Sequence, residues 1–196
     1  LGCAIFAYTQ LLDLVRLRGQ LTGLELDRNG GWAVALNNLY LPKLHRAGYV
    51  APNLPKSGGL TSPGGYVMDS RPGLYKNVLV LDFKSLYPSI IRTFKIDPLG
   101  LLEGLKQPQH AIEGFSGALF SRDKHILPGI ITELWQQRDE AKKIKDQPRS
   151  PALKILMNSF YGLLGTSGCR FCDSRLTSSI TLRGHNIIQQ TTSWIE

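Results

Sequence analysis

The stretch VLVLDFKSLYPSII, residues 78–91, places four apolar residues directly before Asp82 and a Ser-Leu-Tyr-Pro turn shortly after it. The apolar run predicts a buried strand over about 78–83, and Pro88 suits the first turn of a helix that reaches about Phe94. An ionised carboxylate is costly to bury without a partner. Asp82 is therefore interpreted either as a cap of the turn or as a ligand of a hard cation such as Mg²⁺.

The sequence on both sides of this stretch predicts an α+β fold. A second strand is expected over about 65–69, joined to the first by the turn signal Arg71-Pro72-Gly73. Residues 51–65 are rich in Pro, Gly and Ser and predict a loop. Apolar residues at helical spacing predict helices over 5–17, ending near Arg18-Gly19, and over 32–46, 126–145, 151–164 and 178–195.

The charge of the chain favours polyanionic partners. Its 196 residues include 23 Lys and Arg against 15 Asp and Glu, which gives a formal net charge of +8 and a sequence pI near 9.5. Such an excess of cations suits nucleic acid or nucleotide phosphates. No apolar run approaches the roughly 18 residues of a membrane span, so no membrane partner is expected. The chain begins with Leu and lacks signal-peptide features, and we interpret it as a piece of a longer protein.

Cysteine usage fits a reducing compartment, because three cysteines make an odd count for a disulfide framework. Cys169 and Cys172, with His185 further on, imitate three ligands of a zinc finger. No fourth ligand follows at a suitable spacing, which favours buried or idle thiols over a structural zinc site.

Cations recur on the two helices expected over 126–145 and 151–164, whose short connector predicts antiparallel packing. Arg138 and Lys142 lie one turn apart on the first helix, and Lys154 shares a face of the second helix with Asn158 and Tyr161. Three cations on facing helices could clamp a triphosphate. The alternative is an ordinary solvated face.

Two glycines in the second helix, Gly162 and Gly165, each cost about 1 kcal/mol relative to Ala in a helix interior. They could leave room for a flat base pair stacked against Tyr161. Alternatively, the helix ends at Gly162 and Gly165 is a second stop.

Taken together, these segments resemble the polymerase motifs of a known family. DFKSLYPSI (82–90) and KILMNSFYG (154–162) are similar to motifs A and B of B-family DNA polymerases, in the family's order. Arg138 and Lys142 lie between them, where the family carries cations of its fingers subdomain. The resemblance covers residues 60–185.

Two further segments, HRAGYVAPN (45–53) and SPGGYVMDSRPGLY (62–75), are most similar to bacterial members of that family. The resemblance implies template contacts at Gly64, Gly65 and Gly162. At the first of these positions the family usually has a Tyr two places before the first Gly, where this chain has Ser62.

The resemblance also implies roles for individual residues in the active site. Asp82 would be a catalytic carboxylate that holds a Mg²⁺ pair together with the backbone carbonyl of Phe83. Tyr87 would lie under the deoxyribose as a steric gate against a 2′-hydroxyl. Nucleotide contacts are implied for Ser85, Leu86, Tyr87, Arg138, Lys142, Lys154, Asn158 and Tyr161.

In a polymerase of this family, the chain would be a partial palm of short antiparallel strands with a helical-hairpin fingers subdomain. The implied parts are a connector from an exonuclease region (1–59), palm (60–99), fingers (100–172) and a returning palm helix (173–196). The implied partners are primer-template DNA, deoxynucleoside triphosphates and a sliding clamp bound through other regions. The implied location is the cytoplasm of a bacterium, at the nucleoid.

The expected function is thus template-directed deoxynucleotidyl transfer by a two-metal mechanism. The family's second catalytic carboxylate lies in a Tyr-Gly-Asp-Thr-Asp segment that this sequence does not contain, so the chain is expected to be inactive alone. The alternative from another class is a non-catalytic, basic nucleic-acid-binding module that retains polymerase motifs. A basic helical scaffold is a third interpretation, which the two motifs disfavour.

Overall fold

The computed structural model describes residues 11–25, 31–55, 63–69, 71–146 and 148–195. Helices dominate these residues, with one small antiparallel sheet, so the fold is α+β as expected. The elements are α2 (Leu11–Thr22), α3 (Trp32–Arg46), α4 (Leu86–Thr93), α5 (Pro98–Lys106), the 3₁₀ turn η1 (Pro108–His110), β1 (Ile112–Glu113), β2 (Leu119–Phe120), α6 (Leu127–Lys143), α7 (Arg149–Leu164) and α8 (Ser174–Ile195). No helix among these residues has both the length and the apolar character needed to cross a membrane.

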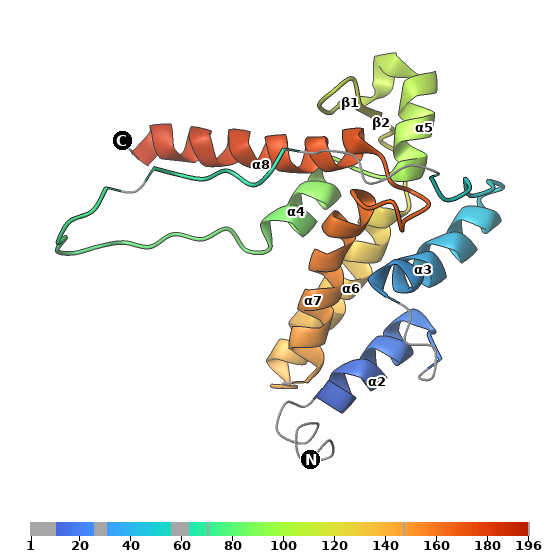
Figure 1. Cartoon of the computed structure of the whole chain (residues 1–196), viewed down its shortest axis with the longest axis horizontal. Coiled ribbons are helices and arrows are strands. Elements are labelled where there is room, and N and C mark those ends of the chain that lie inside the picture. Colours follow the sequence, from blue (N-terminus) through green and yellow to red (C-terminus); the bar gives the residue numbers. More distant parts are fainter. Residues whose placement is uncertain (1–10, 26–30, 56–62, 70, 147, 196) are drawn as a thin grey trace.

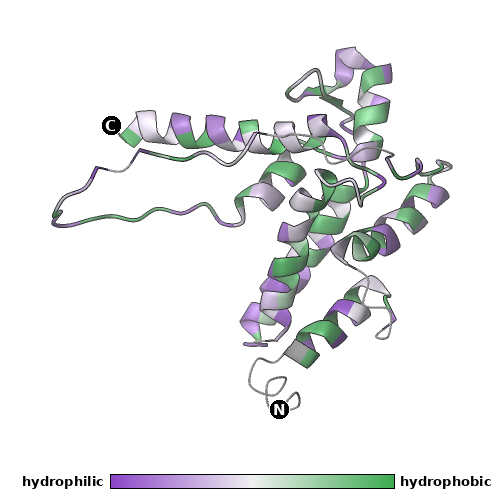
Figure 2. Cartoon of the chain, in the orientation of Figure 1, coloured by the Kyte–Doolittle hydropathy of each residue, from purple (hydrophilic) through white to green (hydrophobic). Residues whose placement is uncertain are grey.

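The prediction of strands over 65–69 and 78–83 is wrong. Both segments are irregular, and Figure 1 shows the chain before α4 as a long arm that leaves the helical body and returns to it. A strand exists only where a neighbour accepts and donates its ladder hydrogen bonds, and no described segment pairs with this arm. Apolar side chains that the pattern marked for burial are therefore exposed: Leu79 is 80% and Val80 84% accessible. Figure 2 shows hydrophobic colouring along much of the arm.

The strands that do form lie elsewhere, in the region expected to be fingers. β1 pairs with β2 in antiparallel register, Ile112 opposite Phe120 and Glu113 opposite Leu119. β2 packs against α5 because Gly104 has no side chain: a Cβ there would overlap the backbone carbonyl of Leu119. Two-residue strands leave almost no alternation to detect, so the sequence pattern does not reveal this hairpin.

The helical hairpin is confirmed. α6 and α7 run alongside each other from a short connector and make the most extensive contact between elements in the described structure (Figure 1). The expected apolar stripes are buried on both helices, from Leu127 to Ala141 and from Leu153 to Phe160. Ile144 lies within the helix expected over 126–145, but it follows the last residue of α6 and is exposed.

Helix ends were less well predicted than helices. α3 occupies the expected residues, whereas α2 continues through Gly19 to Thr22; the part of the expected helix over residues 5–10 lies outside the described residues. α7 begins at Arg149, two residues before Pro151, and α8 begins at Ser174 rather than near Ser178. α5 was not predicted at all, although its start is capped in the usual way by Asp97.

Asp97 joins three helices in the core. Its buried carboxylate accepts hydrogen bonds from Tyr40 Oη (3.0 Å), from the Gly100 backbone N–H (2.7 Å) and from the Leu127 backbone N–H (2.7 Å). Burial raises the pKa of Asp97, while the bonds from Leu127 and Gly100 oppose that rise. The N-termini of α5 and α6 are thereby fixed against Tyr40 of α3, which sets the direction in which α6 carries Arg138.

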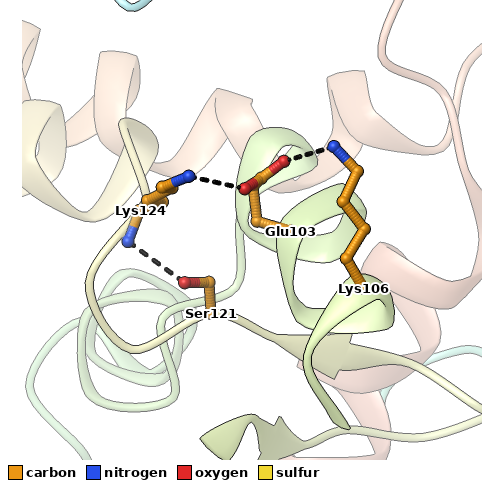
Figure 3. A network of polar contacts seen from close by, with 4 residues as sticks. All are labelled: Glu103, Lys106, Ser121 and Lys124. Atoms are coloured by element: carbon orange, nitrogen blue, oxygen red, sulfur yellow. Dashed lines mark hydrogen bonds and ion pairs between the residues drawn. The ribbon is translucent and has the colours of Figure 1, made fainter.

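A second polar group ties α5 to the loop before α6 (Figure 3). Glu103 Oε1 lies 2.6 Å from Lys106 Nζ, and Glu103 Oε2 lies 2.8 Å from Lys124 Nζ. The hydrogen bonds from Lys106 and Lys124 lower the pKa of Glu103 to about 2. Ser121 Oγ accepts a hydrogen bond from the Lys124 backbone N–H, which anchors the same loop.

Candidate functional site

Ser85 precedes α4 in an unusual backbone conformation. Its φ of 52° and ψ of 59° lie in the left-handed region, which few non-glycine residues adopt. The side chain makes no capping hydrogen bond to its own helix. Instead, Ser85 Oγ accepts a hydrogen bond of 3.1 Å from Arg138 Nη1. The turn after Asp82 is thereby connected to the middle of α6.

Arg138 is a buried cation with unused hydrogen-bonding capacity. Arg138 is only 9% exposed, and no carboxylate among the described residues pairs with it. Its Nε is buried and has no hydrogen-bond partner in the described part of the chain. A guanidinium has five N–H donors, and a buried one without an anion is energetically costly. The arrangement suits an anionic ligand that would supply the missing acceptors.

Two tyrosine rings meet at the first turn of α4, which follows Ser85. The rings of Tyr87 in α4 and Tyr161 in α7 have centroids 4.5 Å apart and planes inclined by 41°. Burial, and then the proximity of Tyr87, raise the pKa of Tyr161. Tyr87 also reaches two glycines: a Cβ on Gly65 would lie 3.5 Å from Tyr87 Oη, and one on Gly184 of α8 would lie 3.8 Å from its Cε1.

The segment that carries Gly64 and Gly65 is held against α8. His185 Nε2 lies 2.9 Å from the carbonyl oxygen of Gly64, which is a hydrogen bond. The ring of Tyr66 meets His185 edge-on with centroids 5.6 Å apart. The glycine pair, Tyr87 and Tyr161 therefore form one continuous surface, assembled from three separate parts of the chain and supported by His185 of α8. Ser62, the position at which this chain departs from the family pattern, lies outside the described residues.

The remaining candidate residues are more open. Leu86 is half-buried and lies against the position of Gly184. Gly162 is in the last turn of α7, which ends at Leu164 with Gly165 as its cap, and a Cβ on Gly162 would meet nothing within 4 Å. The other three polar candidates of the hairpin are exposed at its surface: Lys142, Lys154 and Asn158.

Asp82 does not lie at the end of a buried strand. It is exposed on the arm, three residues before Ser85, and makes no hydrogen bond or ion pair with any described residue. Phe83, 41% accessible, follows it. Nor do the described residues include any group of three or more His, Cys, Asp or Glu side chains that could hold a metal ion. One carboxylate and one carbonyl are oxygen ligands of the kind Mg²⁺ prefers, but they are too few to form a site.

Comparison with known proteins supports the family resemblance that the motifs at 82–90 and 154–162 indicate. The sequence model of DNA polymerase family B matches residues 29–196. The chain belongs to DNA polymerase family B. It is 59% identical over 194 residues to DNA polymerase II of Escherichia coli (strain K12), covering 98% of this chain and 25% of that protein.

Two further relatives are less similar to the chain. The chain is 33% identical over 174 residues to a DNA polymerase of Thermococcus gorgonarius, covering 80% of the chain and 22% of the relative. It is 30% identical over 215 residues to the DNA polymerase delta catalytic subunit of Arabidopsis thaliana, covering 98% of the chain and 19% of the relative. The chain thus spans a quarter or less of the length of these relatives. The expected likeness to bacterial B-family polymerases, based on residues 45–53 and 62–75, is confirmed.

In this B-family chain, the sequence motifs included the residues of the surface formed by the glycine pair, Tyr87 and Tyr161. They did not include the residues that hold this surface in place. His185 was considered only as a zinc ligand, whereas in the structure it bonds to Gly64. Cys169 is buried and Cys172 half-buried, both as free thiols, and burial raises the pKa of Cys169. Tyr66 and Gly184 were not singled out. Gly184 is a glycine within α8, and its cost in a helix interior was the one available signal.

Proposed function

We propose that the chain is the nucleotide-binding part of a DNA-directed DNA polymerase, which adds deoxynucleotides to a primer under the direction of a template. The observation that carries this proposal is the hydrogen bond from Arg138 to Ser85, two residues before Tyr87 of the Tyr87–Tyr161 pair, in a chain of family B. A buried guanidinium with spare donors suits a triphosphate, and paired aromatic rings suit a sugar and a base.

In this proposal the phosphates meet the chain between α4 and the hairpin. The backbone N–H groups at Ser85 and Leu86 open the N-terminus of α4, where an anion is stabilised by unpaired donors and the helix dipole. Arg138, with Lys142, Lys154 and Asn158 of the hairpin, would bind the remaining phosphate oxygens. Neutralising and positioning the triphosphate is the larger part of what a protein contributes to phosphoryl transfer.

The sugar and base would meet the tyrosine surface. Tyr87 would lie under the deoxyribose and exclude a 2′-hydroxyl, and Tyr161 would contact the nascent base pair. Gly64, Gly65 and Gly162 would face the template. This assignment draws support from Gly162, whose backbone is open on the side where a Cβ would be, and from the contact of Gly65 with Tyr87.

The reaction of such a polymerase requires divalent metal ions, and Asp82 with the Phe83 carbonyl would contribute ligands to them. The structure offers these two oxygen donors on an exposed arm, without the further carboxylates that a Mg²⁺ pair needs. The described residues therefore do not fit the metal pair by themselves, and no catalytic step follows from them.

We further propose that the chain divides as the family resemblance implies, into a connector (1–59), palm (60–99), fingers (100–172) and returning palm helix (173–196). The proposed partners are primer-template DNA, deoxynucleoside triphosphates and, through other regions of the protein, a sliding clamp. The proposed place of action is the bacterial nucleoid.

Primer extension tests the proposal. The intact protein that contains this sequence is incubated with a primer-template, Mg²⁺ and the four deoxynucleoside triphosphates, and products are resolved by length. Template-directed extension that is lost in Arg138→Gln would support the proposal. Salt-sensitive DNA binding without any extension by the purified, folded protein would instead establish the alternative, a non-catalytic nucleic-acid-binding module.

A further inference from the structure

A hollow between α4 and α6 has features that the proposed nucleotide site does not use. Its volume is about 320 Å³, and its lining includes Arg92 and Lys95 together with Thr132 and Trp135. Tyr87 of the same helix contacts α7 and α8 instead, so the hollow lies on another face of α4. We refer to it as the Trp135 hollow.

The Trp135 ring orders two cations. The guanidinium carbon of Arg92 lies 4.9 Å from the ring centroid, and Lys84 Nζ lies 5.3 Å from it. Arg92 Nε also donates a hydrogen bond of 3.1 Å to Thr132 Oγ1, which fixes the guanidinium while its two terminal nitrogens make no hydrogen bond within the described residues. Cations held over an aromatic face are already positioned for a ligand and lose less freedom on binding.

The hollow has a positive charge that local carboxylates do not cancel. Asp139 is paired with Lys84 at 3.4 Å, and both side chains are largely exposed, so this pair is weak. Glu133, on the same helix, is paired with Lys43 at 3.0 Å. Lys95 makes no ion pair with a described residue. Arg92 and Lys95 therefore line the hollow, and neither is paired with a carboxylate of the described residues.

The spacing of these cations matches a chain of phosphates better than a single one. Lys84 precedes α4, Arg92 lies in its last turn and Lys95 follows it. Arg92 and Lys84 lie 4.9 and 5.3 Å from the centroid of the same ring, so their charges are at most about 10 Å apart, and Lys95 follows Arg92 by three residues. Three cations within this reach suit neighbouring phosphates of one nucleic-acid strand. We propose that the Trp135 hollow binds the backbone of single-stranded nucleic acid, as a site separate from the nucleotide site.

Crosslinking provides the direct test. A single-stranded oligonucleotide carrying 5-iodouracil is irradiated with the intact protein, and the crosslinked peptide is identified by mass spectrometry. The proposal expects a crosslink on the peptide that contains Trp135, lost at high salt. Absence of that crosslink while the oligonucleotide binds elsewhere overturns it. Inorganic tripolyphosphate is the competing probe: if it alters Trp135 fluorescence and no oligonucleotide crosslinks there, the hollow is a site for small anions and the proposal is wrong.

A matched pair of variants provides the second test. Lys95 and Lys145 both have φ near 55°, so Lys95→Asn and Lys145→Asn make the same change in the same backbone conformation. Lys84→Gln and Lys76→Gln are likewise both on exposed positions of the arm. The double variant at 84 and 95 should weaken oligonucleotide binding by about tenfold and reduce the slope of log K against log salt by about 1.4. The double variant at 76 and 145 should change neither, and equal losses in both would contradict the proposal.

The Trp135 hollow is proposed independently of catalysis. Failure of the polymerase proposal can therefore be distinguished from failure of the proposed nucleic-acid site. Primer extension by the 84 and 95 variant on a template whose single-stranded overhang is only a few nucleotides, too short to reach the Trp135 hollow, should equal that of the unmodified protein. A protein that never extends a primer would refute the polymerase proposal and leave the crosslinking result intact.

Discussion

Arg138 donates a hydrogen bond from Nη1 to Oγ of Ser85, at 3.1 Å, across 53 positions of sequence. The bond joins the middle of α6 to the residue that starts α4, and Ser85 holds a left-handed backbone conformation there. The position of Ser85 therefore depends on the hairpin, and a movement of α6 would be transmitted to the turn that follows Asp82.

This coupling can be measured in a double-mutant cycle of Arg138→Gln and Ser85→Ala. Each single change should destabilise the protein, and the double variant should be less destabilised than their sum by about 1–2 kcal/mol, because both remove the same charged hydrogen bond. The measurement is the free energy of unfolding from urea titrations. Strictly additive effects would mean that the bond contributes nothing.

Tyr87 is expected to exclude ribonucleotides. Tyr87→Ala in the intact protein that contains this chain should raise ribonucleotide incorporation relative to deoxyribonucleotide by about tenfold or more, because it removes the group proposed to clash with a 2′-hydroxyl. Tyr87→Phe is the matched control and should retain discrimination, since the ring rather than the hydroxyl provides the clash. Ratios of kcat/KM for the two nucleotides decide the matter, and unchanged selectivity in Tyr87→Ala would remove this role.

Asp82→Asn should lower turnover by about a hundredfold or more while leaving folding nearly unchanged. An amide is a poor ligand for Mg²⁺, and the exposed Asp82 makes no contact in the described structure whose loss would destabilise the protein. Asp123→Asn, at another exposed position, is the control. If Asp82 instead caps the turn, Tm should fall and the folded fraction should keep its specific activity.

His185 is expected to position the glycine segment through its hydrogen bond to Gly64. His185→Ala should weaken primer-template binding about fivefold, equivalent to about 1 kcal/mol, with a smaller effect on kcat. His185→Gln keeps an N–H donor and should restore part of the loss. A purely structural role would show as a lower Tm with unchanged DNA affinity in both variants.

Glu103 should stabilise the fold in a pH-dependent way. Lys106 and Lys124 lower its folded-state pKa from 4.5 to about 2. An acid with a lowered pKa contributes stability above its unfolded pKa, and that contribution is lost as pH falls through the folded value. Glu103→Gln should therefore reduce the free energy of unfolding at pH 7, and its difference from the unmodified protein should shrink between about pH 4.5 and pH 2. A difference that is constant with pH would contradict an ionic role.

The sequence by itself determined the family of this protein and most of its helices, with α5 as the exception. Helical hydrogen bonds join residues four apart, so the periodicity of α3, α6 and α7 is contained in each segment. The two motifs around Asp82 and Lys154 likewise identify family B without any geometry, as the match over residues 29–196 confirms.

Only the tertiary structure decided the strands and the support of the site. Residues 78–83 have the pattern of a strand, but a strand needs a partner outside itself, and in the described residues they form an exposed arm. The contacts of Arg138 with Ser85 and of His185 with Gly64 join residues 53 and 121 positions apart. No local pattern encodes such contacts, because they depend on how α4, α6 and α8 pack against one another.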